Sequence, residues 1–112
     1  MSNFVIKKAQ VNNIALTLSE RSRLLFPWFL FVFKSKFCLE DTFAYCTLQA
    51  SSNDRFDLLQ IEEKTSPDNL EGEVFLIEGE WSYEVYESQV ATLDVTETTQ
   101  RVLQRGFIIV KD

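Results

Sequence analysis

The sequence predicts an all-β protein, an antiparallel β-sandwich of seven to eight strands in a single domain over residues 1–112. Short segments alternate apolar and polar side chains, as half-buried strands do. Turn-forming residues separate these segments at a spacing of about 8–12 residues, which is typical of sandwiches. The densest apolar and aromatic run, LLFPWFLFVFKSKF at residues 24–37, supplies a central strand around which the others are organised.

The central strand is predicted at residues 29–36. Pro27 argues against one long helix through this run, because proline lacks the amide hydrogen that a helix interior needs. Side chains alternate between the two faces of a strand. The bulkier set is placed inward, toward the core: Phe29, Phe31 and Phe33. The opposite face carries Leu30, Val32 and Lys34.

Two interpretations stay open for this outward face. It is covered either by the protein's own loops or N-terminal arm, or by another protein chain. The second interpretation makes Trp28, Leu30 and Val32 the candidate interface, because apolar patches on soluble proteins often mark partner contacts.

The remaining strands follow from alternation and from apolar runs. Residues 1–12 form an N-terminal arm or an edge strand. Further strands are expected at residues 14–18, 43–49, 56–62, 74–77, 81–86 and 107–110. The acidic, threonine-rich segment 90–99 is either a long connection or a weak edge strand. Residues 107–110 are continuously apolar, which is typical of a strand inside a sheet.

The strand at residues 56–62 has an irregular pattern. Phe56, Leu58 and Ile61 are the side chains expected to point inward. The phase slips by one residue between Leu58 and Ile61, which suggests a bulge. A helix over residues 58–64 is the alternative.

The formal net charge is −6, and 46% of the residues are hydrophobic. An acidic chain lacks the basic surface that neutralises phosphates, which argues against binding nucleic acid or an anionic membrane. The central apolar run is about ten residues, whereas a membrane-spanning helix needs about 20. Residues 1–8 lack the layout of a signal peptide. We therefore expect a protein made and kept in a cytoplasm, or assembled there into something larger.

The two cysteines, Cys38 and Cys46, lie near a predicted hairpin. A disulfide between them is geometrically conceivable, but two cysteines are too few for a disulfide-framework fold. Free thiols are the favoured interpretation. With no histidine and no second cysteine pair, the chain has no zinc-binding pattern.

No motif predicts catalysis or a cofactor. The absence of histidine removes the usual general base and metal ligand, and the three glycines are too scattered for a phosphate-binding loop. The nearest thing to a site is an acidic cluster: Glu71, Glu73, Glu78, Glu80, Glu84 and Glu87. Paired carboxylates can do acid–base work or bind calcium, but alternating glutamates usually mark the solvent face of strands. We therefore expect no enzyme activity, no cofactor and no metal.

Trp81, Tyr83 and Tyr86 form an aromatic series on the strand at residues 81–86. They could stack on carbohydrate, but core and cross-strand packing explains Trp81 and Tyr83 as well. The strand also looks like the penultimate strand of immunoglobulin-like sandwiches, where a tyrosine near a corner stabilises the turn. The corner here is Gly79. We therefore expect the sandwich to be immunoglobulin-like.

Three segments together carry a resemblance to a known family: PWFLFVF at residues 27–33, RFD at 55–57 leading into IE at 61–62, and GEWSYEVYE at 79–87. In this order and spacing they resemble short all-β proteins encoded among the virion genes of tailed bacteriophages that infect Bacteroidetes-type bacteria. The resemblance covers about residues 14–110. The chain departs from the family pattern at Lys36, at Cys38 and in the long acidic turn at residues 65–73.

The resemblance implies a structural virion protein of a head, neck or tail, present in many copies and in contact with other virion proteins. It implies no catalytic residues. It also implies location in the virion after synthesis in the host cytoplasm. The alternative function is an adhesion or glycan-binding module of a virion or cell surface, which uses exposed aromatic side chains such as Trp28 or Tyr86.

Overall fold

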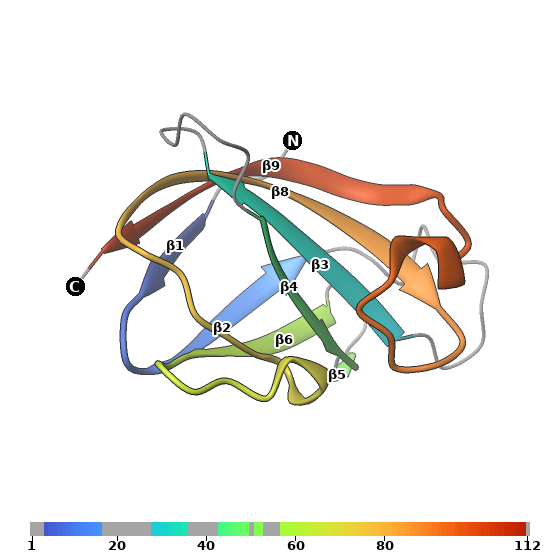
Figure 1. Cartoon of the computed structure of the whole chain (residues 1–112), viewed down its shortest axis with the longest axis horizontal. Helices are drawn as coiled ribbons and strands as arrows, with labels where there is room; N and C mark the ends of the chain where they lie inside the picture. Colours follow the sequence, from blue (N-terminus) through green and yellow to red (C-terminus); the bar gives the residue numbers. More distant parts are fainter. Residues whose placement is uncertain (1–3, 17–27, 36–42, 50, 53–56, 112) are drawn as a thin grey trace.

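The strands of the computed structural model form two sheets packed face to face, which confirms the predicted all-β sandwich (Figure 1). The structure describes residues 4–16, 28–35, 43–49, 51–52 and 57–111. Sheet A has the strand order β1 (Phe4–Lys7), β9 (Val102–Lys111), β8 (Gly79–Ser88), β3 (Trp28–Ser35) and β4 (Phe43–Leu48). Sheet B has the order β2 (Val11–Leu16), β6 (Asp57–Glu63) and β5 (Ser51–Ser52), with β7 (Glu73–Val74) also paired to β6. Within the described ranges the helical elements are two short 3₁₀ turns, η1 (Asn69–Glu71) and η2 (Val95–Glu97).

The described strand pairs are antiparallel except for two short parallel pairs, β1 with β9 and β6 with β7. β3 lies inside sheet A between β4 and β8, so the predicted central strand is confirmed. β1 forms one edge of sheet A, in agreement with the expected N-terminal edge strand. Of the strand predicted at residues 74–77, only Val74 lies in a strand, as the last residue of β7, so this prediction is wrong for 75–77. Segment 90–99 is a connection that carries η2 rather than an edge strand.

The space between the sheets is filled by the side chains predicted to face inward from β3. Phe29, Phe31 and Phe33 are buried in one core cluster with Trp81 and Tyr83 of β8. The ring centroids of Phe31 and Tyr83 lie 6.3 Å apart. Burying a phenyl side chain of this kind contributes about 1.5–3 kcal/mol, so this aromatic group is a major source of stability. Sheet B completes the core with aliphatic side chains, among them Ile14, Leu59, Ile61 and Val74.

Cys46 of β4 is a buried free thiol within the same core. Burial raises the pKa of this thiol far above its usual range, because a thiolate would lose its hydration in apolar surroundings. The predicted free thiol is therefore confirmed for Cys46. Cys38 lies outside the described residues.

β6 is a regular strand, so the suggested bulge and the alternative helix over residues 58–64 are both wrong. It pairs with β2 without a break, from Leu16 opposite Asp57 to Val11 opposite Glu62. Leu59 and Ile61 are the β6 side chains in the core, which confirms the inward direction of Ile61, and Leu59 takes an inward position that was not predicted. Phe56 lies outside the described residues. The regular alternation also rules out the helix over residues 58–64. A register shift does occur elsewhere, between Val85 and Tyr86 of β8, where the partner strand is β9.

A buried carboxylate fixes the turn between β1 and β2, where the chain passes from sheet A to sheet B. The side chain of Glu63 is 2% exposed. Its oxygens accept hydrogen bonds from the backbone N–H groups of Ala9 at 2.9 Å and Leu76 at 3.0 Å, and Lys8 Nζ lies 3.3 Å away. Burial by itself raises the pKa of Glu63, but these donors outweigh it and the net pKa is lower than usual. Glu63 therefore stays ionised and joins three chain segments.

Candidate functional site

The outer face of sheet A, the side turned away from sheet B, carries a group of exposed apolar side chains. Four of them are between 41% and 49% exposed: Val5, Phe43, Phe107 and Ile109. Val5 pairs with Ile109 across β1 and β9, and Phe107 lies two residues before Ile109 on β9. Apolar surface that is left in water carries a free-energy cost, and where it gathers on a sheet face it often marks a contact with a partner.

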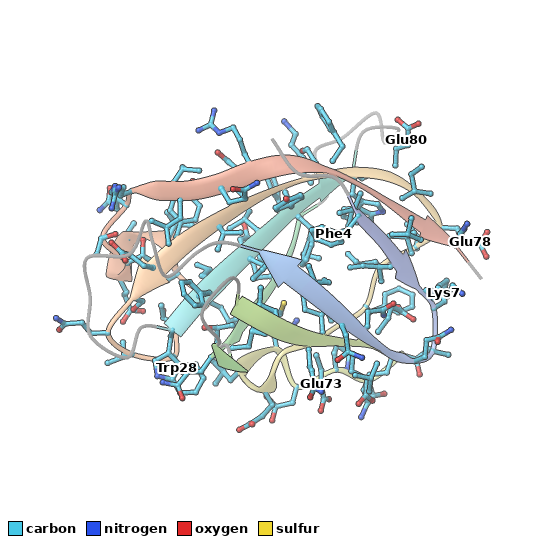
Figure 2. All side chains as sticks on the ribbon, turned by 180° about the vertical axis from the view of Figure 1, so that it is seen from behind. Phe4, Lys7, Trp28, Glu73, Glu78 and Glu80 are labelled. Atoms are coloured by element: carbon cyan, nitrogen blue, oxygen red, sulfur yellow. The ribbon has the colours of Figure 1, made fainter. Side chains whose placement is uncertain are left out.

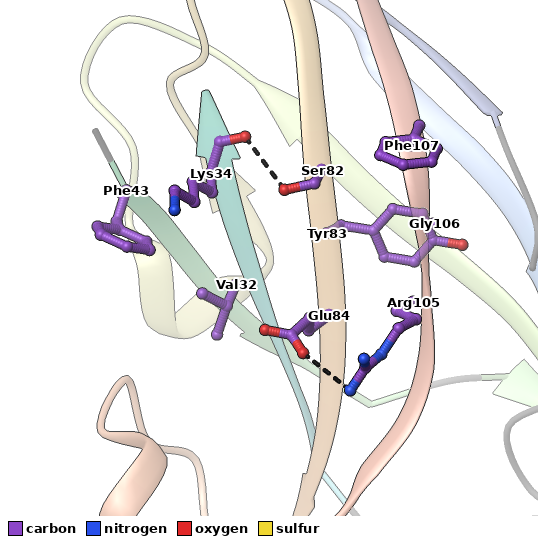
Figure 3. A pocket seen from close by; sticks show the side chains of 9 residues that line it. All are labelled: Val32, Lys34, Phe43, Ser82, Tyr83, Glu84, Arg105, Gly106 and Phe107. Carbon is purple, nitrogen blue, oxygen red and sulfur yellow. Dashed lines mark hydrogen bonds and ion pairs between the residues drawn. The ribbon is translucent and has the colours of Figure 1, made fainter. Parts of the chain in front are cut away.

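A row of four side chains crosses this face and contains a hollow (Figure 3). Phe107, Ser82, Lys34 and Phe43 are successive register partners on β9, β8, β3 and β4. The lining of the hollow includes these four residues and Gly106, and its volume is about 220 Å³. The Ser82 hydroxyl donates a hydrogen bond to the Lys34 carbonyl oxygen at 3.5 Å. Ser82, which stands in the row between Phe107 and Lys34, is small and leaves space that a larger side chain would fill.

Charged groups stand around the hollow. Arg105 Nη2 lies 3.3 Å from Glu84 Oε2, and Lys34 Nζ lies 5.8 Å from the centre of the Phe43 ring. Burial raises the pKa of Tyr86, and the neighbouring charge and hydrogen bond of Glu84 raise it further. The site thus combines apolar walls with a few polar groups, as binding hollows usually do.

Cations outnumber carboxylates on this side of sheet A. Four exposed cations project from its strands: Lys7, Lys34, Arg105 and Lys111. Among the described strand residues, two carboxylates share the side, Glu80 and Glu84. The excess of two positive charges contrasts with the net charge of −6 of the whole chain. We call this surface the basic face, made of the four cations together with Val5, Phe43, Phe107 and Ile109.

The three predicted interface residues lie on this side of sheet A, but the chain covers them to different degrees. Leu30 is 0% exposed and Val32 is 9% exposed, whereas Trp28 is partly buried. Leu30 and Val32 do not belong to the core cluster between the sheets, so their outward direction agrees with the prediction. For Leu30 the structure agrees with the first interpretation, because the protein's own chain already buries this side chain. Val32 lines the hollow, and the interface role of the three residues stays a prediction.

Sequence reasoning missed Phe107 and Ile109 as surface residues. The continuous apolar run at 107–110 predicted a strand covered on both faces. β9 does lie inside sheet A, but Ile108 and Val110 are the side chains of this run that belong to the core. Each sheet of a two-layer sandwich has one outer face. A strand that is apolar on both faces must therefore expose one face to water or bury it against a partner. The continuous apolar run at 107–110 was thus a sequence signal that could have pointed to this site.

The predicted acidic cluster does not form a site. Within the described residues, no group of three His, Cys, Asp or Glu side chains is placed to hold a metal ion. Glu84 pairs with Arg105, and Glu73 lies 3.3 Å from Lys64. Glu87 is buried, with Arg101 3.8 Å away. The expected solvent exposure is therefore wrong for Glu87.

The aromatic series of β8 belongs mainly to the core. Trp81 and Tyr83 are buried, which confirms the packing interpretation and removes them from a carbohydrate platform. Trp81 Nε1 donates a hydrogen bond to the Ile77 carbonyl oxygen at 3.0 Å. Burial raises the pKa of Tyr83, although a hydrogen bond with the Gln104 side chain partly offsets the effect. Tyr86, which points to the other side, is partly buried.

Comparisons with protein-family profiles, with characterised proteins and with solved structures found no match to this chain. In the part of the chain that the structure describes, no helix is long and apolar enough to cross a membrane.

Proposed function

We propose that this protein is a non-enzymatic structural component of a bacteriophage virion, a head, neck or tail accessory protein that acts through protein–protein contacts. It is made in the host cytoplasm and is incorporated in many copies beside other virion proteins. The observation that carries the contact role is the basic face, where four large apolar side chains stay exposed on one sheet face. The virion role is supported by the segments at 27–33, 55–62 and 79–87, which resemble phage virion proteins.

The composition of the basic face supports protein docking. Protein interfaces have an apolar centre and a polar rim, and here phenyl and aliphatic groups lie among four cations. Full burial of such a side chain contributes about 1.5–3 kcal/mol, and because these four are 41–49% exposed, a partner that covers the rest adds roughly half of that for each. Phe107 lines the hollow and is the natural anchor for a contact, because interface energy concentrates in a few side chains at filled pockets.

Mass spectrometry of purified virions tests this proposal. We expect the wild-type chain in the particles. Phe107→Glu should be missing from them, because it places a carboxylate in the apolar part of the face. Phe75→Glu is the matched control: Phe75 is 42% exposed and Phe107 is 41% exposed, but Phe75 lies outside the basic face. A wild-type chain absent from particles contradicts the virion role, and normal incorporation of folded Phe107→Glu contradicts docking through the basic face.

A glycan-binding module is the second candidate, and the hollow favours it. Phe43 and Phe107 stand on two sides of a polar floor at Ser82. Phenyl rings pack against the apolar faces of sugar rings, and the neighbouring charged groups can bind hydroxyls. A glycan array separates the two functions, because saturable binding that Phe107→Glu abolishes would support the glycan module.

We further infer that the sandwich is immunoglobulin-like. In that fold, strands G, F and C form one sheet that variable-type domains extend with C′, and strands B, E and D belong to the other sheet. The order β9-β8-β3-β4 and the order β2-β6-β5 are consistent with these two sets. One departure is that the described cysteine, Cys46 of β4, is a free thiol rather than part of an inter-sheet disulfide.

A further inference from the structure

We propose that the basic face of one copy docks on an acidic corner of a second copy of the same chain. The inference rests on the proposed structural role and names the partner of its contact surface. We define the acidic corner as the exposed and partly exposed residues Glu62, Asp68, Leu70, Glu71 and Glu73, on β6, β7 and the turn that contains η1.

The acidic corner is one continuous surface. Lys64 Nζ lies 3.8 Å from Glu62 and 3.3 Å from Glu73, and Glu73 accepts a hydrogen bond from the backbone N–H of Asp68 at 3.0 Å. Four carboxylates against the single cation Lys64 leave an excess of three negative charges here. Figure 2 shows Glu73 below the strands of sheet B and Glu80 at the opposite edge of the molecule.

The two surfaces complement each other in charge. The basic face has an excess of two positive charges and the acidic corner an excess of three negative charges. The whole chain carries −6, so two copies repel each other in most orientations. When the basic face of one copy meets the acidic corner of another, the local charges attract instead. Other relative orientations bring like charges together and are disfavoured.

The two surfaces also complement each other in their apolar groups. Leu70 of η1 is exposed and stands between Asp68 and Glu71. The hollow between Phe43 and Phe107 can receive an aliphatic side chain of this kind, with Lys34 and Arg105 beside the carboxylates that flank it. An apolar anchor in a pocket, ringed by paired charges, is the usual layout of a strong contact point.

The contact joins two different surfaces, so it is heterologous. A heterologous contact leaves one unused basic face and one unused acidic corner on every pair, and addition of copies builds a ring or a filament. The η1 turn lies against the edge strand β4, where Asn69 Nδ2 donates a hydrogen bond to the Tyr45 carbonyl oxygen at 2.6 Å. The acidic corner is therefore held rigidly with respect to sheet A, and successive copies would repeat one geometry.

Sedimentation velocity of the purified full chain tests this inference. We expect a mass that rises with protein concentration at low salt and falls as salt screens the charges. Phe107→Glu on the basic face and the double variant Leu70→Lys with Glu71→Lys on the acidic corner should each weaken association at least about tenfold. Phe75→Glu should behave as the wild type. Thermal melting confirms that each variant is folded, and Ile109→Glu replaces Phe107→Glu if the latter does not fold.

Mixing the two defective variants gives the decisive result. Each retains one intact surface, so an equimolar mixture should form dimers and nothing larger. A wild-type chain that stays monomeric at every concentration and salt, or a mixture that stays monomeric, overturns the inference. If a monomeric chain is nevertheless found in virions, the proposed virion role stands without this contact. If the chain self-associates but is absent from virions, the contact stands and the virion role fails.

Discussion

Lys8 Nζ lies 3.3 Å from the carboxylate of Glu63, a side chain that is almost completely buried. The same ammonium donates a hydrogen bond to the Leu76 carbonyl oxygen at 2.7 Å and lies 4.6 Å from the centre of the Phe75 ring. Because Glu63 also binds Ala9 and Leu76 through their backbone N–H groups, one ion pair joins the β1–β2 turn, the end of β6 and the segment after β7.

The first prediction concerns the pH dependence that follows from Glu63. The pKa of Glu63 is lower in the folded protein than in the unfolded chain. The ionised carboxylate therefore stabilises the fold fully at pH values above the unfolded pKa, and this stabilisation is lost as the pH falls through the folded pKa. Glu63→Gln should lower the free energy of unfolding by about 2–4 kcal/mol at pH 7. The variant removes the buried negative charge, and its amide NH2 group faces Lys8 or a backbone N–H, which are also donors. Urea melts between about pH 3 and pH 7 should show this cost shrinking toward low pH.

Glu71→Gln is the control for that experiment, because Glu71 is exposed on η1. It should change the free energy of unfolding by less than about 0.5 kcal/mol. A cost for Glu63→Gln that stays constant across the pH range would contradict the role given to the Glu63 charge.

The second prediction concerns Trp81. Its ring is buried and its indole N–H is hydrogen-bonded to Ile77. Trp81→Ala should destabilise the protein by about 3–5 kcal/mol. Phe75→Ala, at an exposed ring, should cost less than about 1 kcal/mol. Urea melts of the two variants measure the difference, and equal small costs would show that Trp81 is not part of the core.

The third prediction distinguishes the buried Leu30 from the exposed Phe107, which both lie on the outer face of sheet A. Leu30 is completely buried, so Leu30→Asp should unfold the isolated protein and Leu30→Ala should cost about 2–5 kcal/mol. Phe107→Glu should leave the melting temperature nearly unchanged, because the ring is already partly in water. If Leu30→Asp is folded and stable in thermal melts, the burial of Leu30 is not maintained in solution.

The fourth prediction concerns the cysteines. Cys46 is buried, and its raised pKa keeps it in the unreactive thiol form. It should not react with a thiol reagent at neutral pH in the native protein. After denaturation without prior reduction, Cys38 and Cys46 should both react. One or no reactive thiol per chain in urea would indicate a disulfide.

The fifth prediction concerns Thr47, which is buried on the outer side of β4. Its hydroxyl has no hydrogen-bond partner among the described residues. Thr47→Val should therefore be neutral or stabilising by about 1 kcal/mol, because it removes an unsatisfied buried group without changing shape. Thr92→Val is the control: the Thr92 hydroxyl accepts a hydrogen bond from the Asp94 N–H and donates one to Glu97. That variant should be destabilised by about 1 kcal/mol in the same melts.

Several features of the fold could be predicted from local pattern. The alternation through Phe29, Phe31 and Phe33 placed these rings in the core, and the same reasoning put Leu30 and Val32 on the other side. These predictions succeed because the side-chain direction along a strand has a period of two, and residues next to one another in the chain encode it. Pattern reasoning failed at β6, where apolar residues on both faces made the phase ambiguous.

The candidate site could be predicted only in part. Val32 lies in the hollow, but the exposed rings of Phe43 and Phe107 come from strands 64 positions apart in sequence. Their place in one row depends on the strand order β9-β8-β3-β4, which pairs residues far apart in the chain. Local alternation says which face a side chain occupies and nothing about which strand lies beside it.

The sequence by itself determined the all-β class, the central position of β3 and the inward direction of its phenylalanines. Only the tertiary structure decided that β1 pairs in parallel with β9, that Glu63 is buried against Lys8, and that Leu30 is covered while Phe107 is exposed. The physical reason is the range of the interactions. Face and turn preferences are set by neighbouring residues, whereas strand partners, buried charges and solvent exposure depend on segments that meet only when the whole sandwich closes.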